Sequence, residues 1–238
     1  MIVIPMAGLS SRFYKAGYDI PKYMLEAKGK SIFEHSVGSF SKYFSSKKFV
    51  FIIRDFCDTK AFVKQRVELL GIKEYDIVAL NSETRGQAET VALGLESYKE
   101  VNKSITIFNI DTFRPGFLFP DLSDLGNGYL EVFKGSGCNW SYVKPIGNGS
   151  KISLTTEKNP ISNLCCTGLY HFSHIKDFFE AYQAYASLSH DKWEKGELYV
   201  APLYNFLIRN GKDIHYNLIK REEVVFCGTP EEYKDLLK

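Results

Sequence analysis

The residues best suited to chemistry stand near the beginning of the chain. The apolar run Ile2-Val3-Ile4 leads into the small-residue loop Pro5-Met6-Ala7-Gly8-Leu9-Ser10-Ser11, which ends at Arg12, and Lys22 follows ten residues later. Backbone N–H groups of such a loop converge on anionic oxygens, and Gly8 has no Cβ to block their approach. Arg12 adds a planar guanidinium that matches phosphate geometry, and Lys22 adds a second positive charge. Two cations beside a strand-to-loop turn indicate a polyphosphate ligand.

Asp111 is the next candidate, because it closely follows an apolar strand. The run Ser104-Ile105-Thr106-Ile107-Phe108 leads into Asn109-Ile110-Asp111-Thr112. A carboxylate at the carboxyl end of a parallel strand lies where α/β sheets bind ligands. Beside a triphosphate, a single Asp is typical of a Mg²⁺ site, since Mg²⁺ is held by one or two carboxylates together with phosphates and water. A cap for the following turn is an equal alternative on this evidence alone.

Further polar motifs could recognise a base and an acceptor. Arg85-Gly86-Gln87 opens a predicted helix, where Gly86 permits close backbone approach and Gln87 carries both a donor and an acceptor for a base edge. The second half contains carboxylates and lysines that suit a phosphorylated, hydroxyl-rich acceptor, in the motifs Glu157-Lys158, Thr167-Gly168-Leu169-Tyr170 and Lys195-Gly196-Glu197. Taken singly, an exposed helix cap and surface charges are the plainer explanations of these motifs.

The composition bounds the class of protein. The chain has 238 residues, 45% of them hydrophobic and 24% charged, which suits one large globular α/β domain. A net charge of +2, with the basic residues spread along the chain, does not indicate a nucleic-acid partner. Five scattered cysteines without C-x-x-C spacing indicate a reducing compartment and argue against a disulfide framework or a zinc site. The N-terminus lacks a signal-peptide pattern and no segment predicts a membrane span, so we expect a cytoplasmic protein.

The elements that must position these residues alternate in type through the first half. Strands are predicted at 2–4, 49–53, 75–80 and 104–108. Helices are predicted at 31–44, 58–70 and 84–98. Asp58 is the expected cap of the second helix, which Gly71 ends. This alternation predicts a mostly parallel, doubly wound sheet.

The pattern changes after Asp111, where glycine-punctuated short segments predict antiparallel strands. Later elements are predicted as strands at 167–172, 213–219 and 224–226, helices at 175–188 and 199–208, and a final helix from Pro230 with Thr229 as its cap. The chain has no repeat and no linker. We therefore expect one domain over 1–238, with a nucleotide-binding half of about 1–112 and an acceptor-binding half of about 113–238.

The motifs occur in a fixed order along nearly the whole chain. They are Pro5-Met6-Ala7-Gly8-x-x-Ser11-Arg12-Phe13, Ala16-Gly17-Tyr18, Pro21-Lys22, Gly86-Gln87-Ala88-Glu89-Thr90, Asn109-x-Asp111-Thr112, Glu157-Lys158, Thr167-Gly168-x-Tyr170, Gly196-Glu197 and Gly228-Thr229-Pro230. In this order the chain resembles the sugar-phosphate nucleotidylyltransferases of the nucleotide-diphospho-sugar transferase superfamily, and within it the capsule-locus, glycosyltransferase family 2-like subgroup. The resemblance implies a Rossmann-like fold with a mostly parallel central sheet and a small antiparallel sheet on the acceptor side.

The resemblance also implies a role for each matched residue. Catalytic roles fall to Arg12, Lys22 and Asp111, with Asp111 as the ligand of Mg²⁺. Nucleotide binding falls to Ala7, Gly8, Ser11, Arg12, Gly86, Gln87 and Asn109. Acceptor binding falls to Glu157, Lys158, Gly168 and Glu197. One departure concerns the metal: many relatives carry a second Asp two residues before the C-terminal Gly-Thr, where this chain has Phe226, with Glu222 and Glu223 as the nearby carboxylates.

The reaction that the resemblance implies joins an NTP to a phosphorylated acceptor, with a sugar 1-phosphate as the first expectation, and releases pyrophosphate. Its product would be a precursor of surface or capsular polysaccharide. The acceptor phosphate attacks the α-phosphorus in line, and no general base is needed because a phosphate dianion is already a nucleophile. The partners expected are the NTP and the acceptor, without nucleic acid or membrane, and a homo-oligomer stays open.

Alternative functions remain at this point. A glycosyltransferase that uses a nucleotide sugar usually shows Asp-x-Asp at the metal position, whereas this chain has Asp111-Thr112-Phe113. A cytidylyltransferase acting on a non-sugar phosphate such as phosphocholine also fits the motifs. A catalytically silent nucleotide-binding module is disfavoured by the intact Arg12, Lys22 and Asp111, although the missing second Asp keeps it open.

Overall fold

The computed structural model describes residues 1–238 and has the predicted α/β class. Its internal contacts divide the chain into two compact units. We call residues 2–83, 108–118 and 222–238 the N-terminal unit, and Met1 with residues 84–107 and 119–221 the central unit. The expected division into halves of 1–112 and 113–238 stays a prediction. None of the helices has the length and apolar character needed to cross a membrane.

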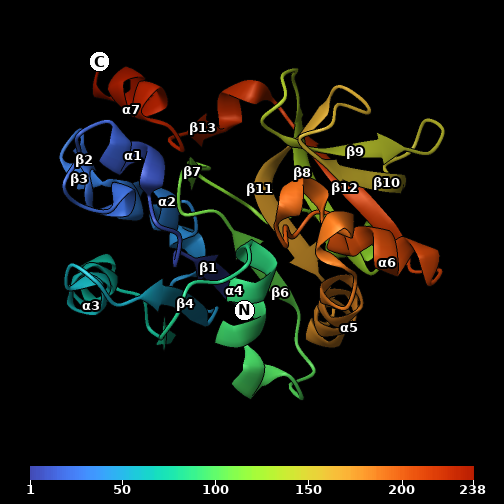
Figure 1. The fold of residues 1–238 in the computed structure, drawn as a ribbon, viewed down its shortest axis with the longest axis horizontal. Coiled ribbons are helices and arrows are strands. Elements are labelled where there is room, and N and C mark those ends of the chain that lie inside the picture. The colour runs from blue at the N-terminus through green and yellow to red at the C-terminus, as the bar shows by residue number, and fades with distance from the viewer. The chain divides into compact units, whose positions relative to one another are not determined.

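Parallel strands form the centre of the N-terminal unit (Figure 1). β1 (Ile2–Pro5) pairs in parallel with β4 (Phe49–Arg54), and β4 pairs in parallel with β5 (Tyr75–Leu80). β1 and nearly all of β4 are buried, as expected for continuous apolar runs. The connections run through α2 (Ile32–Gly38) and α3 (Thr59–Leu70). The parallel strands predicted for this part of the chain are therefore present.

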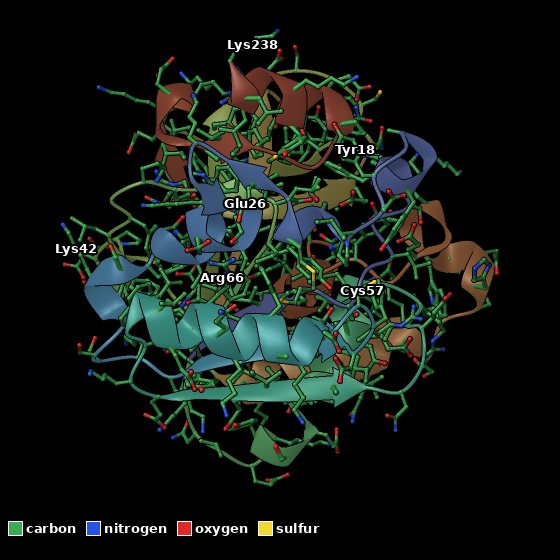
Figure 2. The ribbon with its side chains drawn as sticks, turned by 90° about the vertical axis from the view of Figure 1, so that its left-hand side faces the viewer. Tyr18, Glu26, Lys42, Cys57, Arg66 and Lys238 are labelled. Atoms are coloured by element: carbon green, nitrogen blue, oxygen red, sulfur yellow. The ribbon has the colours of Figure 1, made fainter.

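Short elements complete the N-terminal unit. They are α1 (Ser11–Lys15), the 3-10 helices η1 (Lys22–Met24) and η2 (Ser41–Tyr43), the hairpin β2 (Glu26–Ala27) and β3 (Lys30–Ser31), the antiparallel pair β7 (Thr112–Phe113) and β13 (Val225–Phe226), and α7 (Pro230–Leu237). A buried cluster joins these segments, made of Phe13, Leu25, Ala27, Ile32, Phe113, Cys227 and Tyr233. In Figure 2, Arg66 on α3 lies below Glu26, and its guanidinium is 3.9 Å from that carboxylate.

The central unit contains the predicted antiparallel strands. The strand order is β10 (Ile152–Glu157), β9 (Ser141–Pro145), β11 (Leu164–Phe172) and β6 (Ile105–Phe108). β8 (Gly128–Lys134) pairs antiparallel with β11 and parallel with β12 (Ile214–Ile219). The helices are α4 (Gln87–Gly94), α5 (Ile175–Ala186) and α6 (Leu203–Arg209). The 3-10 helices are η3 (Glu96–Tyr98), η4 (Leu122–Asp124), η5 (His190–Lys192) and η6 (Glu194–Gly196), and η7 (Arg221–Glu223) lies where the central unit ends.

Several helix boundaries differ from the prediction. The helix expected at 84–98 begins only at Gln87, because Gly86 has a φ of 147° that no helix accepts, and it ends at Gly94. The helix expected at 31–44 ends at Gly38 and is followed by the separate turn η2. The helix expected at 199–208 begins at Leu203, immediately after Pro202.

The predicted cap of α3 is wrong in its chemistry. Asp58 stands at the N-cap position with a φ of 54°, but its side chain makes no capping hydrogen bond. The carboxylate of Asp55 accepts the Lys60 N–H at 3.0 Å instead. Gly71 ends the helix in the left-handed conformation, as expected. The cap of α7 follows the prediction, because Thr229 and Glu232 form a complete capping box.

Candidate active site

The loop between β1 and α1 leaves its backbone accessible at Gly8. A Cβ built on Gly8 meets nothing within 4 Å, so this position is open. Ser10 turns the chain into α1 with a left-handed φ of 52°, and its carbonyl accepts the Phe13 N–H at 2.9 Å. Ala7 is buried, whereas Ser11 and Arg12 are exposed on the first turn of α1. The loop therefore offers backbone N–H groups and an exposed guanidinium to an anionic ligand.

Lys22 and Asp111 lie together in the N-terminal unit. Lys22 Nζ donates a hydrogen bond to Asp111 Oδ2, and both side chains are about one-fifth exposed, at 20% and 22%. The backbone N–H of Lys22 donates to Ser10 Oγ at 3.2 Å. The loop, the lysine and the carboxylate thus form one connected chain of contacts.

The C-terminal Gly-Thr motif lies against Asp111. The Cys227 N–H donates to the Asp111 carbonyl at 2.8 Å, and a Cβ on Gly228 would lie 3.0 Å from Asp111 Oδ2. Glu232 Oε2 accepts the N–H groups of Gly228 at 2.8 Å and Thr229 at 3.0 Å. Burial, with the nearby charges of Asp111 and Glu232, raises the pKa of Cys227 to about 12. The Cys227 side chain is consequently a neutral thiol and not a thiolate ligand.

Neither Glu222 nor Glu223, the two carboxylates named from the sequence, is placed to replace the missing Asp at position 226. Phe226 is half-buried on β13, opposite Thr112. Glu223 is committed to Arg114, whose Nη1 donates to the Glu223 carbonyl at 2.6 Å and lies 3.8 Å from its carboxylate. Glu222 is exposed. The structure contains no group of three or more His, Cys, Asp or Glu side chains arranged to hold a metal.

Asn109 lies at the turn that leads to Asp111. Its carbonyl accepts the Ser36 hydroxyl at 3.2 Å and the Thr112 N–H at 3.2 Å. These bonds link the segment after β6 to α2 and fix the turn on which Asp111 stands. Asn109 is therefore placed as a support for Asp111, and its role toward a nucleotide stays a prediction.

An open hollow of about 460 Å³ lies beside the loop. It is lined by Leu9, Ser11, Tyr14, Lys15, Arg54 and Phe56. Aliphatic and aromatic side chains supply most of its walls, and two cations border it. Such a hollow suits a planar group that carries negative charge nearby.

In the central unit, Gly86 is packed against the segment that follows Glu197. A Cβ on Gly86 would lie 2.6 Å from both the N and the O of Leu198. The Leu198 N–H donates to the Arg85 carbonyl at 2.9 Å, and the Ala88 N–H donates to the Leu198 carbonyl at 2.8 Å. Only glycine fits at this position, and the close pairing fixes the start of α4, where Gln87 stands.

An ion pair stabilises the same turn. Arg85 Nε donates to Glu89 Oε1 at 2.7 Å, and the Arg85 N–H donates to Glu89 Oε2 at 2.5 Å. Burial raises the pKa of Glu89, but the hydrogen bonds from Arg85 outweigh burial and lower it overall. Glu89 is therefore ionised at neutral pH and serves as an internal anchor for the Gly86–Gln87 turn.

Glu157 is a buried carboxylate at the end of β10. Ser141 Oγ donates to Glu157 Oε2 and lies 3.4 Å from the hydroxyl of Tyr170. The backbone N–H of Glu157 donates to the carboxylate of Glu194. Burial raises the pKa of Glu157, the charges of Glu194 and Glu197 add to the rise, and the hydrogen bond from Ser141 opposes it. Burial likewise raises the pKa of Glu194.

The other residues predicted to bind the acceptor are Lys158, Gly168 and Glu197, which lie in the same unit as Glu157. Lys158 Nζ donates to the Tyr199 hydroxyl at 2.6 Å and lies 4.7 Å from the centre of that ring. Gly168 has a φ of 96° and lies within the bulge of β11, between Cys166 and Tyr170. Glu197 is exposed. This group can hold a ligand that carries both hydrogen-bond donors and a phosphate.

The comparison with solved structures decides the family. The crystal structure of a nucleoside-diphosphate-sugar pyrophosphorylase from Vibrio cholerae is 58% identical in sequence to this chain and superposes on it with a TM-score of 0.95. The match covers 100% of this chain and 99% of the Vibrio cholerae chain. The chain belongs to the nucleoside-diphosphate-sugar pyrophosphorylase family. Comparisons with protein-family models and with curated protein sequences give no match.

More distant structures share the fold of this pyrophosphorylase family. The inositol-1-phosphate CTP transferase from T. maritima is 16% identical, with 99% of this chain and 94% of that one covered and a TM-score of 0.75. A UDP-glucose pyrophosphorylase complexed with UDP-glucose is 14% identical, with 99% and 96% covered and a TM-score of 0.72. The expected resemblance to sugar-phosphate nucleotidylyltransferases is thus confirmed at the level of the family.

Within each unit of this pyrophosphorylase-family member, the sequence did not indicate several residues that contact the predicted site residues or line the hollow beside the loop. They are Ser10, Tyr14, Arg54, Ser141, Glu194, Tyr199 and Glu232. Glu232 had a usable signal, since Thr229-x-x-Glu232 has capping-box spacing. Ser141 and Glu194 had none, because they reach Glu157 only through strand pairing and a distant turn.

Proposed function

We propose that the protein joins an NTP to a sugar 1-phosphate and releases pyrophosphate. In this reaction an oxygen of the sugar phosphate attacks the α-phosphorus, the bond from the α-phosphorus to the bridging oxygen breaks, and pyrophosphate leaves with the electron pair. The contact that carries the proposal is the Lys22–Asp111 pair beside the open loop at Gly8. Membership of the pyrophosphorylase family supports the same chemistry.

Charge neutralisation is the main task of the residues in the N-terminal unit. Arg12 and the loop N–H groups would bind the phosphates, with Ser11 on the first turn of α1. Lys22 would stabilise the negative charge that develops as pyrophosphate departs. The sugar phosphate arrives as a dianion, so no histidine or carboxylate is needed as a general base. Positioning and electrostatics therefore supply the rate enhancement, as in phosphoryl transfer generally.

Asp111 fits a divalent cation of the hard, oxygen-preferring type. Oδ2 of this carboxylate is bound to Lys22, and the side chain is 22% exposed, so Oδ1 would be the oxygen offered to the cation. Phe226 contributes no oxygen, so the remaining ligands would be substrate phosphates and water, which is the usual donor set of Mg²⁺. Bound there, Mg²⁺ would neutralise charge on the reacting phosphates.

Residues of the central unit would select the two substrates. Gln87 would read the base edge with its amide, on a turn fixed by the Gly86–Leu198 pairing. Glu157 would accept hydrogen bonds from sugar hydroxyls, and Lys158 would exchange its contact with Tyr199 for the acceptor phosphate. The product would serve as a precursor of surface or capsular polysaccharide, and an NTP-consuming enzyme with free cysteines is expected in the cytoplasm.

A small phosphorylated amine such as phosphocholine, activated by CTP, is the second candidate acceptor. The charges around Glu157 favour it, because Glu194 and Glu197 both act on this carboxylate while Lys158 is the nearby cation. Tyr170 and Tyr199 add aromatic rings of the kind that bind ammonium groups. The ammonium group of such an acceptor would add positive charge where three carboxylates face one lysine.

Pyrophosphate release from four NTPs, each paired with a panel of sugar 1-phosphates, phosphocholine and other phosphorylated amines, tests the proposal. We expect one pair to turn over, and we expect EDTA and Asp111→Asn each to abolish that turnover while NTP binding stays detectable. Turnover that survives both treatments would remove the metal role of Asp111. Absence of pyrophosphate release with every pair would refute nucleotidyl transfer to these acceptors.

A further inference from the structure

Ser10 has a backbone conformation that serine seldom adopts. Its φ of 52° and ψ of 28° are left-handed, where an L side chain costs free energy and glycine does not. It stands at the N-cap position of α1, yet its side chain makes no capping hydrogen bond. Neither the turn nor the helix therefore accounts for a hydroxyl at this position.

The hydroxyl of Ser10 is used by Lys22 instead. Lys22 is the first residue of η1, and an N–H at that place has no partner within its own turn. Ser10 Oγ accepts this N–H at 3.2 Å. The bond joins the two ends of the segment between the loop and η1.

Side chains on both sides of the Ser10–Lys22 hydrogen bond anchor this segment to α7 and α3, so the bond defines the position of the Lys22 backbone. Phe13 and Tyr18 pack against Tyr233 of α7, with ring centres 6.2 Å and 5.6 Å from it. Next to Lys22, the buried Tyr23 hydroxyl lies 2.9 Å from Thr59 Oγ1 at the start of α3. Figure 2 shows Tyr18 at the outer edge of this region and Cys57 close to the start of α3. Between these anchors, the Ser10 hydroxyl fixes the backbone from which the Lys22 side chain reaches Asp111.

We propose that Ser10 is a positioning residue: its hydroxyl holds the Lys22 backbone so that the ammonium group is presented at the phosphate-binding loop. The effect on catalysis rests on the proposed function, whereas the contact itself does not. A net hydrogen bond of this kind changes an equilibrium by about two- to tenfold, so turnover should fall by that factor when the hydroxyl is removed.

Two substitutions separate the hydroxyl from the backbone strain. Ser10→Ala removes the hydroxyl and keeps the left-handed strain, and Ser10→Gly removes both. Lys28→Gly is the matched control, because Lys28 has the same left-handed conformation, with a φ of 51°, in the β2–β3 turn of the same unit. We expect both Ser10 variants to lose kcat by about two- to tenfold, although Ser10→Gly melts at or above the wild-type temperature. Lys28→Gly should keep the wild-type kcat.

Two further measurements identify the mechanism. Hydrogen exchange at the Lys22 amide should be faster in both Ser10 variants and unchanged in Lys28→Gly. Ser10→Gly should cause no additional loss of kcat in a Lys22→Ala background, since the residue that Ser10 positions is then absent. An equal loss in both backgrounds, or wild-type exchange at Lys22 in the Ser10 variants, would overturn the proposal. A wild-type protein without turnover would overturn the proposed function, while hydrogen exchange would still judge the contact.

Discussion

Gly86→Ala offers the sharpest test of how the central unit is built. A Cβ at this position would lie 2.6 Å from the N and O of Leu198. The alanine backbone would also have to adopt a φ of 147°. The strained backbone costs about 1–3 kcal/mol. If the added methyl group pushes the Gly86 and Leu198 segments apart, the two backbone hydrogen bonds of Leu198 are also lost, each worth about 0.5–1.5 kcal/mol net. The expected loss is about 2–6 kcal/mol, out of a typical stability of about 5–15 kcal/mol.

Urea unfolding followed by circular dichroism measures this loss. The matched variant is Gly8→Ala, because a Cβ at Gly8 meets nothing within 4 Å and its φ is not positive. Gly8→Ala should unfold within about 0.5 kcal/mol of wild type, and it should bind NTP more weakly because the added methyl group obstructs the phosphates. A Gly86→Ala protein with the wild-type midpoint would refute the reasoning about Leu198, and wild-type NTP affinity in Gly8→Ala would refute the close approach of phosphate.

Three further perturbations probe charge. Lys22→Ala should lower kcat by about 10²-fold or more with little change in melting temperature, and near-normal turnover in a folded variant would contradict its role. Phe226→Asp should fold, because the side chain is only half-buried, and should lower the Mg²⁺ concentration needed for half-maximal activity; a collapsed melting temperature that Mg²⁺-NTP does not restore would instead show that Phe226 is required for packing. Burial raises the pKa of Glu157 in the folded protein, so the folded protein loses stability as pH rises through that pKa and the carboxyl ionises. Glu157→Gln should therefore melt at a higher temperature than wild type at pH 8, by about 2–4 °C for each kcal/mol of stability gained. This difference in melting temperature should vanish as pH falls below the ordinary carboxyl pKa. An equal difference at pH 4 and pH 8 would argue against that titration.

The sequence predicted the strands of the fold well, and the limits lay at helix starts. Continuous apolar runs such as 49–53 have one reasonable interpretation, because a strand buried on both faces leaves no polar alternation. Helix starts depend on single backbone conformations, and Gly86 and Pro202 set two of them later than periodicity suggested. Asp58 shows the same limit, since position identified it as an N-cap residue but could not show that its side chain would turn away.

For the candidate site, motif order identified residue types and could not supply their partners. Lys22 and Asp111 were assigned separately, and their direct contact depends on how segments far apart in the chain fold together. Ser10 lies within the predicted phosphate-binding loop, but nothing in the sequence indicates that its hydroxyl accepts the Lys22 N–H. Glu194 reaches Glu157 through a turn near 194–196, which no local pattern connects to β10.

The N-terminal unit is built from three segments that lie far apart in the sequence, and this has a consequence for its synthesis. The strand that carries the loop at Gly8 is synthesised well before Gly228, Glu232 and Tyr233, which belong to the same unit. At about 5–20 residues per second, the loop waits roughly 10–40 s for the segment that packs behind Asp111. A nascent chain that stops before α7 already contains the loop, Arg12 and Lys22, but it lacks Glu232 and Tyr233, so the segment behind Asp111 cannot pack completely. The packing around Asp111 is therefore completed only after α7 has been synthesised.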